Sequence, residues 1–286
     1  MRISIEEKSG YCSGVLRVVR LADQILDRGE ELFCLGQIVH NELEVKRLVE
    51  KGLKFINNED LSKLHDCKVL LRAHGEPPET YEIARNNNIE IFDGTCPIVK
   101  RIQRRIRKDG TNGGQVIIFG KIDHPEVRGL RAQVKGRVDV IRTEEEAEKI
   151  KLSDVIYLYA QTTMDAEMYR RVSSILRKRT REQGGEIMVN DTICGNVSHR
   201  LPGLKKFAKE NDVIVFIAGS NSSNGRMLFE MCKAENERSH FITDHDEIRK
   251  EWFLNAGSIG ISGATSTPRW QIEKAYEIVN KMTGKK

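Results

Sequence analysis

The chain has 286 residues, of which 39% are hydrophobic and 31% are charged, and its formal net charge is +5. Such a chain is expected to form two or three small water-soluble domains, and its mild charge suits an anionic small substrate without singling one out. No apolar run approaches the roughly 20 residues of a membrane span, and the first residues lack the apolar core of a signal peptide. We therefore expect a cytoplasmic protein without a membrane partner.

Apolar, β-branched runs alternate with helical patterns along the chain. The first helix is expected over residues 15–27, where apolar residues recur at helical spacing until Gly29, and the last is expected from Thr267 through Lys281. Continuous apolar runs are typical of strands buried on both faces of parallel sheets. They start at residues 32, 68, 91, 115, 155, 186, 213 and 258, and the first is expected to continue to Val39. The pattern predicts an α/β fold.

Residues 98–108 carry an isoleucine stripe, Ile98, Ile102 and Ile106, among six Lys and Arg residues. The stripe predicts an amphipathic helix whose basic side chains face water. No aromatic residues interleave with the basic ones, as they do where bases stack on a protein. We expect no nucleic-acid partner.

The predicted strand ends collect polar side chains. In open parallel sheets, ligands bind beyond the carboxyl ends of the strands, so these residues are candidates for a shared site. The chain has neither a G-x-G-x-x-G after its first strand nor a Walker A lysine motif, so nucleotide binding does not explain them. They are His40, His74, Cys96, His124, Glu126, Thr162, Thr163, Cys194, Ser222, Ser223, Asn224 and Ser266.

Three cysteines stand among small residues just before a helical pattern: Cys12, Cys96 and Cys194. Pro97 suits the first position of a helix, so Cys96 is expected at or next to the N-cap, where the helix dipole favours a thiolate. The alternative for Cys96 is a buried cysteine that packs as a small hydrophobe. Reduced thiols in a cytosolic chain favour metal or redox chemistry over disulfides.

The spacing of these three cysteines predicts one thiolate from each of three similar α/β units. No C-x-x-C motif occurs, so a local zinc ribbon or ferredoxin-type site is not expected. Three thiolates fit either zinc with a water or a cubane iron–sulfur cluster with one open iron, and the spacing does not decide between them. The other cysteines lie inside apolar or helical runs and are interpreted as packing residues: Cys34, Cys67 and Cys232.

Short segments of the chain resemble a known family. They are GYCSGV, IVHNELEV, AHG, FDGTCPIV, HPEVRG, QTT, IC, GSNSSN and the STP of GATSTP, and they span nearly the whole chain. In this order they resemble the 4-hydroxy-3-methylbut-2-enyl diphosphate reductase family (the IspH or LytB family). The resemblance implies three α/β lobes in pseudo-threefold arrangement around a central iron–sulfur site. The expected lobes are residues 14–96, residues 97–193, and residues 194–286 completed by residues 1–13.

The resemblance also implies a reaction and its cofactor. The cofactor is one 4Fe–4S cluster with one open iron and three cysteine ligands, Cys12, Cys96 and Cys194. The enzyme would reduce an allylic alcohol diphosphate, 4-hydroxy-3-methylbut-2-enyl diphosphate, to isopentenyl and dimethylallyl diphosphate in the methylerythritol phosphate pathway of isoprenoid synthesis. Its electrons would come from a reduced donor of the ferredoxin or flavodoxin type.

Residue roles follow from the same resemblance. Glu126 would donate the proton, Thr162 would stand between it and the substrate, and His124 would lie beside the diphosphate and the proton path. The implied substrate-binding residues are His40, His74, His124, Thr162, Ser222, Ser223, Asn224 and Ser266.

Some residues depart from the usual pattern of the family, which leaves other functions open. Glu76 follows AHG where a small apolar residue is usual, residues 196–203 differ after the third cysteine, and residues 225–227 differ after SSN. Glu76, Asn196 and His199 are therefore candidates for altering the substrate or partner docking. The alternatives are a related cluster-dependent reductase, a zinc hydrolase acting on a phosphate ester, and a non-catalytic iron–sulfur protein for electron transfer or iron sensing.

Overall fold

The computed structural model describes residues 1–198 and 200–284. Strands and helices alternate along most of this part of the chain, and the strands form three four-stranded sheets. The inner strand pairs β6–β8 and β10–β12 are parallel, as are the pairs that outer strands form with them and the pair β4–β5, so the predicted α/β class is confirmed. None of the helices in the described residues is long and apolar enough to cross a membrane.

One sheet joins the two ends of the chain. Its strand order is β1 (Arg2–Ile5), β12 (Ser258–Gly263), β10 (Val213–Ile217) and β11 (Ser239–Ile242). The first strand pairs in parallel with β12, with Ile5 opposite Ile261. The N-terminal strand therefore completes the C-terminal sheet.

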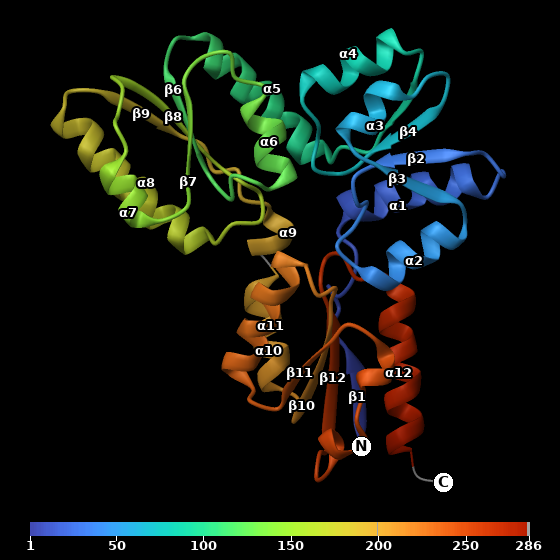
Figure 1. Ribbon diagram of the computed structural model, residues 1–286. Coiled ribbons are helices and arrows are strands. Elements are labelled where there is room, and N and C mark those ends of the chain that lie inside the picture. The colour runs from blue at the N-terminus through green and yellow to red at the C-terminus, as the bar shows by residue number, and fades with distance from the viewer. Residues whose placement is uncertain (199, 285–286) are drawn as a thin grey trace. The chain divides into compact units, whose positions relative to one another are not determined.

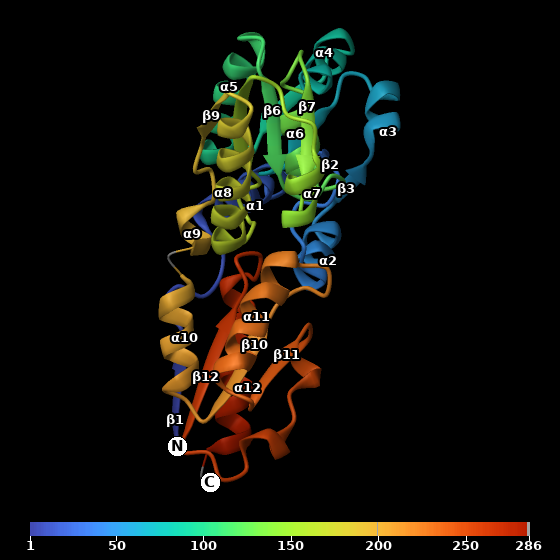
Figure 2. The same ribbon diagram turned by 90° about the vertical axis from the view of Figure 1, so that its left-hand side faces the viewer.

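Helices cover both faces of this sheet because β10 is apolar at every position. Val213, Val215 and Ile217 pack in a cluster with α12 (Arg269–Thr283). Ile214 and Phe216 point to the other face, toward α10 (Leu201–Lys209) and α11 (Ser223–Glu235). The two faces are visible in Figure 1, and Figure 2 shows α10 and α11 in front of the strands with α12 behind.

A second sheet has the order β7 (Val138–Ile141), β6 (Gln115–Phe119), β8 (Val155–Ala160) and β9 (Glu186–Val189). One face packs on α5 (Pro97–Thr111) and α6 (Pro125–Arg131), and the other on α7 (Glu144–Lys149) and α8 (Ala166–Glu182). Ile102 and Ile106 of α5 are buried, while Arg101, Arg104 and Arg105 are exposed. The predicted solvated basic face of this helix is confirmed.

The third sheet has the order β3 (Leu53–Ile56), β2 (Leu32–Leu35), β4 (Lys68–Leu71) and β5 (Glu90–Asp93). Its connecting helices are α1 (Ser13–Leu26), α2 (Glu42–Glu50), α3 (Asn58–Lys63) and α4 (Pro78–Asn86). The prediction that β2 continues to Val39 is wrong. Gly36 follows Leu35 with a φ of 72°, which takes the backbone out of the strand, and Ile38 and Val39 are buried in the loop.

Three strands carry no long apolar run and were not expected: β3, β7 and β11. All three are edge strands of their sheets. An edge strand is covered on fewer sides, so it needs no continuous apolar sequence.

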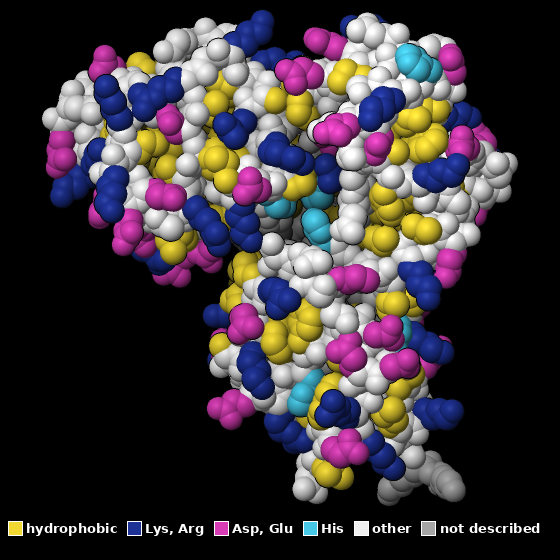
Figure 3. All heavy atoms as spheres, in the orientation of Figure 1, with side chains coloured by type: hydrophobic (Ala, Val, Ile, Leu, Met, Phe, Trp, Pro, Cys, Tyr) yellow, Lys and Arg dark blue, Asp and Glu magenta, His cyan; other side chains and the backbone are white. Residues whose placement is uncertain are grey.

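The chain divides into two compact units, residues 1–55 with the described part of 199–286, and residues 56–198. The strands of each sheet fall within one of the three expected lobes. The lobe boundaries and the pseudo-threefold arrangement stay predictions. On the face drawn in Figure 3, basic and acidic side chains are interspersed, in keeping with the mild net charge of +5.

Candidate active site

Each of the three sheets has a topological switch point between its two inner strands, where consecutive connections turn to opposite sides. Two of these switch points concern most of the predicted site residues. In one sheet β6 and β8 are neighbours, with β7 beyond β6 and β9 beyond β8. In the other β10 and β12 are neighbours, with β11 beyond β10 and β1 beyond β12. Loops at the carboxyl ends of such strands diverge and leave a crevice, which is the usual ligand site of open α/β sheets. Most of the predicted site residues lie on these loops.

At the first switch point Glu126 and Thr162 form a buried pair. The Thr162 backbone N–H donates to Oε1 of Glu126 at 2.7 Å, and the Thr162 hydroxyl lies 2.6 Å from Oε2. The exposed fraction of Glu126 is only 2%. Burial raises the pKa of Glu126 to about 7, although the hydrogen bonds from Thr162 act in the opposite direction. Near neutral pH this carboxyl is therefore poised to give or take a proton.

The helix that carries Glu126 also orients His124. His124 is the N-cap of α6, Pro125 takes the first helical position, and the Glu126 N–H donates to Nδ1 of His124 at 3.2 Å. Because Nδ1 accepts, the neutral ring carries its proton on Nε2. His74 meets His124 edge to face, with ring centroids 5.2 Å apart. The backbone after His74 comes so close to α6 that residue 129 must be glycine, since a Cβ there would lie 2.6 Å from the carbonyl oxygen of Gly75.

At the second switch point Asn224 pairs with Thr265. Oδ1 of Asn224 accepts from the Thr265 hydroxyl at 2.9 Å and from its backbone N–H at 3.4 Å. The residue is 9% exposed, and its Nδ2 is buried with no hydrogen-bond partner among the described residues. An amide held in this way presents two N–H donors.

His40, Ser222 and Ser266 converge beside this pair within one compact unit. Ser222 is the N-cap of α11, and its hydroxyl lies 3.3 Å from that of Ser266. The Ser266 hydroxyl also donates to the carbonyl oxygen of His40 at 3.3 Å. The neighbouring Gly219 has to be glycine, because a Cβ there would lie 2.2 Å from the same oxygen. Ser223, at the first position of α11, is exposed.

The three candidate cluster ligands share one backbone contact. Each cysteine N–H donates to the carbonyl oxygen of the second residue after the end of a strand: β12, β4 and β8 respectively. The pairs are Cys12 with Thr265 at 3.4 Å, Cys96 with Ala73 at 3.0 Å, and Cys194 with Thr162 at 2.8 Å. All three side chains are half-buried.

These positions fit a metal or cluster bound by soft ligands. Cys12 and Cys96 are the N-caps of α1 and α5, as predicted for Cys96, and Cys194 directly precedes the short α9 (Gly195–Ser198). Cysteine sulfur is a soft ligand of the kind that iron and zinc bind. The anchored main chain at all three cysteines suits the donor set that the resemblance implies.

The remaining cysteines differ from one another. Cys34 and Cys232 are fully buried in β2 and α11, which confirms them as packing residues. Cys67 is half-buried in the loop before β4, so its interpretation as a packing residue stays a prediction.

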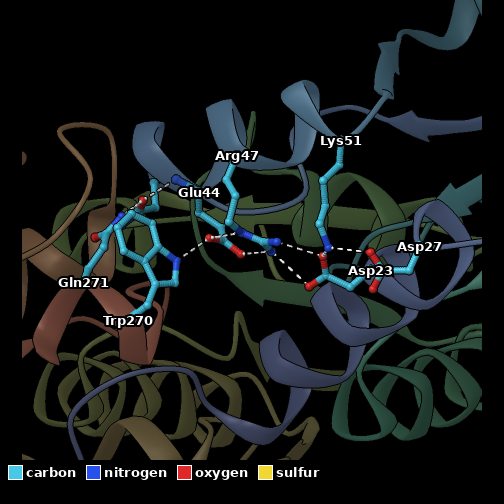
Figure 4. Close-up of polar contacts among 8 residues, drawn as sticks. Asp23, Asp27, Glu44, Arg47, Lys51, Trp270 and Gln271 are labelled. Atoms are coloured by element: carbon cyan, nitrogen blue, oxygen red, sulfur yellow. Dashed lines mark hydrogen bonds and ion pairs between the residues drawn. The ribbon is translucent and has the colours of Figure 1, made fainter. Parts of the chain in front are cut away.

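A polar network fixes the three helices that begin beside Cys12, His40 and Ser266. Figure 4 shows these helices, α1, α2 and α12, joined by side chains from each. Glu44, only 1% exposed, accepts from the indole N–H of Trp270 at 2.9 Å and pairs with Arg47 at 2.6 Å. A carboxylate loses its hydration when it is buried, and partners such as these compensate for that loss.

The network continues in both directions from Glu44. Arg47 donates to both oxygens of Asp23, at 2.8 and 3.0 Å, and Lys51 bridges Asp23 and Asp27 at 2.7 and 2.8 Å. At the other end Asn41 and Gln271 exchange two amide hydrogen bonds, at 3.0 and 2.8 Å. The starts of α2 and α12 are thus tied together by side chains, and the last turn of α1 is held by Arg47 and Lys51 of α2 (Figure 4).

The departures from the family pattern have varied surroundings. Glu76 is buried and forms an ion pair at 3.2 Å with Arg72, which is not one of the predicted site residues. Asn196 is exposed on α9, and His199 lies outside the described residues. Gly225 is buried, and a Cβ there would lie 2.6 Å from the side chain of Ala218.

Comparison with known proteins places the chain in a family. The sequence profile of the LytB protein family matches residues 3–280. The chain belongs to this family. A LytB relative from Bacteroides fragilis, a 4-hydroxy-3-methylbut-2-enyl diphosphate reductase, is 44% identical over 283 residues, covering 98% of this chain and 97% of the relative. The reductase of Chlorobaculum parvum is 40% identical, covering 99% and 98%.

Two solved structures have the same fold. One, of (E)-4-hydroxy-3-methyl-but-2-enyl diphosphate reductase, the terminal enzyme of the non-mevalonate pathway, has a TM-score of 0.77 at 32% identity, covering 98% of this chain and 100% of that chain. The Plasmodium falciparum reductase has a TM-score of 0.86 and covers 98% of this chain and 88% of that chain. Its identity is 22%, so it supports the fold alone.

Some members of this LytB site are not among the residues predicted from the sequence. Thr265 was not singled out, although it follows its strand at the same distance as Thr162 follows β8. That equal spacing was the signal available in the sequence. The partners of Glu44 had no such signal, since Trp270 is 226 residues away.

Proposed function

We propose that this LytB protein is a 4-hydroxy-3-methylbut-2-enyl diphosphate reductase, which removes the substrate hydroxyl as water and forms isopentenyl and dimethylallyl diphosphate. The overall change consumes two electrons and two protons for each C–O bond broken. The observation that carries the proposal is the buried carboxyl of Glu126, held by Thr162, in a chain whose relatives are reductases of this name. An electron carrier or iron sensor has no need of such an acid.

We propose that Cys12, Cys96 and Cys194 ligate one 4Fe–4S cluster, leaving one iron without a protein ligand. When bound, the cluster supplies the two electrons and a Lewis-acidic iron. The anchored backbone N–H of each cysteine supports this assignment. The electrons would come from a ferredoxin or flavodoxin type donor in the cytoplasm, where thiols are kept reduced.

Glu126 supplies the proton through Thr162. In its neutral form the carboxyl O–H of Glu126 donates to the Thr162 hydroxyl 2.6 Å away, and that hydroxyl can then donate to the leaving oxygen of the substrate. The Thr162 N–H stays on the other carboxyl oxygen and keeps the acid in place. Burial excludes water that would otherwise exchange the proton.

The diphosphate is bound by donors at strand ends and helix starts. Asn224 offers Nδ2, and Ser222 and Ser266 offer hydroxyls next to the N-terminus of α11, where unpaired N–H groups favour anions. Ser223, His40, His74 and His124 complete the proposed set, with His124 donating through Nε2. The departures near the site, residues 196–203 and 225–227 with Glu76, would tune which diphosphate is accepted.

The deciding experiment is anaerobic reduction of 4-hydroxy-3-methylbut-2-enyl diphosphate with an artificial one-electron reductant, with metal analysis of the same protein. We expect iron in the protein and formation of both five-carbon diphosphates. Iron without turnover of this substrate would favour a related reductase or a non-catalytic protein. Zinc without iron, with release of phosphate, would favour a hydrolase.

A further inference from the structure

The Asn224–Thr265 pair occupies the same place in its sheet as the Glu126–Thr162 pair does in the other. Asn224 and Glu126 are each the second residue of the helix that follows an inner strand. Thr265 and Thr162 are each the second residue after the neighbouring inner strand. In both pairs the threonine gives its backbone N–H and its hydroxyl to side-chain oxygens of its partner. The same backbone arrangement therefore holds an acid at the ends of β6 and β8 and an amide at the ends of β10 and β12.

The donors of Thr265 decide which way the Asn224 amide faces. A backbone N–H can only donate, so the amide atom that faces it is Oδ1 and not Nδ2. The hydroxyl of Thr265, at 2.9 Å, is the shorter of the two contacts and acts on the same oxygen. Nδ2 is thereby directed away from Thr265 and is buried without a partner in the described part of the chain. A buried donor is costly unless something accepts from it.

We propose that Thr265 is a positioning residue for the anion site: its hydroxyl holds the Asn224 amide so that Nδ2 points at the phosphoryl oxygens of the substrate. The inference rests on the proposed function, because it takes the diphosphate to be the acceptor. With the amide turned over, Oδ1 would face the anion and repel it. The backbone N–H thus sets which amide atom faces Thr265, and the hydroxyl, bound to the same oxygen, holds the amide in that orientation.

The role of the Thr265 side chain can be separated from that of its main chain. The carbonyl oxygen of Thr265 accepts from the Cys12 N–H at 3.4 Å, and any residue at this position retains that oxygen. Thr265→Val keeps the side-chain shape and the backbone while removing only the hydroxyl. Thr265→Ser keeps the hydroxyl. A change seen in the valine variant alone therefore belongs to the bond with Asn224.

The test is binding of inorganic pyrophosphate, measured by calorimetry on iron-loaded wild-type protein and variants. We expect Thr265→Val to bind roughly three- to tenfold more weakly, the range for one lost hydrogen bond, and Thr265→Ser to bind like wild type. In turnover assays KM for the substrate should rise by the same factor, with kcat within about twofold. Iron content should be unchanged in both variants.

A double-mutant comparison separates positioning from a general loss of structure. In an Asn224→Ala background, Thr265→Val should weaken pyrophosphate binding no further, since no amide remains to orient. Thr180→Val is the matched control, because it removes another buried threonine hydroxyl, one that donates to the carbonyl oxygen of Leu176 in α8. It should leave pyrophosphate affinity unchanged.

The outcomes also distinguish this inference from the proposed function. Wild-type affinity in Thr265→Val, or an equal loss with and without Asn224, overturns the positioning role while wild-type turnover upholds the reductase. Failure of the wild-type protein to bind pyrophosphate and to reduce the substrate overturns the reductase, and the inference with it.

Discussion

Thr162 places both of its polar hydrogens against Glu126, with the N–H at 2.7 Å from one carboxyl oxygen and the hydroxyl at 2.6 Å from the other. Two donors would ordinarily stabilise the carboxylate and lower its pKa. Burial outweighs them and brings the pKa of Glu126 to about 7. Near neutral pH both forms are therefore populated: the carboxylate accepts from the Thr162 hydroxyl, and the neutral acid donates to it through Oε2.

Glu126→Gln should abolish proton delivery while preserving the shape of the site. The amide keeps an oxygen for the Thr162 N–H but has no acidic proton, so kcat should fall by at least about a hundredfold. Steady-state reduction under anaerobic conditions measures the loss, and pyrophosphate binding with iron content serves as the control. Near-normal turnover in this variant would show that another group supplies the proton.

The pH dependence of turnover should follow the same carboxyl. The active form is protonated, so kcat should decline as the pH rises through about 7, whereas the ordinary value of 4.5 would place the decline in acid. The folded protein holds this proton more tightly than the unfolded chain does. Its contribution to stability is therefore lost as the pH rises from about 4.5 to about 7. A pH–rate profile that is flat from pH 6 to about pH 8 would contradict the assignment.

Serine substitution should separate the cluster ligands from the other cysteines. Cys12→Ser, Cys96→Ser and Cys194→Ser should each lose most of the bound iron, because each removes one of three thiolates. Cys67→Ser is the matched control, since Cys67 is half-buried like the three but lies in the loop before β4. Iron analysis of anaerobically purified protein decides the matter, and full iron in Cys96→Ser would be incompatible with the ligand set.

Glu6→Ala should destabilise the fold more than any exposed charge change. Arg200, 2% exposed, donates to Glu6 at 2.5 Å, to Ser262 at 3.0 Å and to the carbonyl oxygen of Gly263 at 2.7 Å. Removing Glu6 leaves the Arg200 charge buried without its counter-ion, at a cost of about 3–5 kcal/mol. Urea unfolding measures the change in the free energy of unfolding.

The control for this prediction is an ion pair on the surface. Arg269 and Glu273 lie 2.8 Å apart on α12, with both side chains more than half exposed. Glu273→Ala should shift the unfolding midpoint little, because exposed pairs contribute about 0–1 kcal/mol. Equal shifts in Glu6→Ala and Glu273→Ala would mean that burial of the Arg200 pair does not matter.

Local patterns were enough to locate the inner strands and the helix starts. The apolar runs of four inner strands are recognisable in the sequence: β6, β8, β10 and β12. The Cys-Pro sequence likewise predicts the start of α5 without information from the rest of the chain. The edge strands β3, β7 and β11 escaped notice because partial exposure relaxes their composition. The family resemblance implied which residues belong to the site, but it did not indicate which of them contact one another.

Which strand ends meet depends on the order of strands in each sheet, and no local pattern encodes that order. Glu126 and Thr162 are 36 residues apart, and Asn224 and Thr265 are 41 apart. They become neighbours because β6 lies beside β8 and β10 beside β12. The sequence could place an acid, an amide and two threonines at strand ends. Burial and pairing across the switch points then give the acid a pKa of about 7 and direct the buried amide donor away from Thr265. Both effects depend on residues distant in the chain.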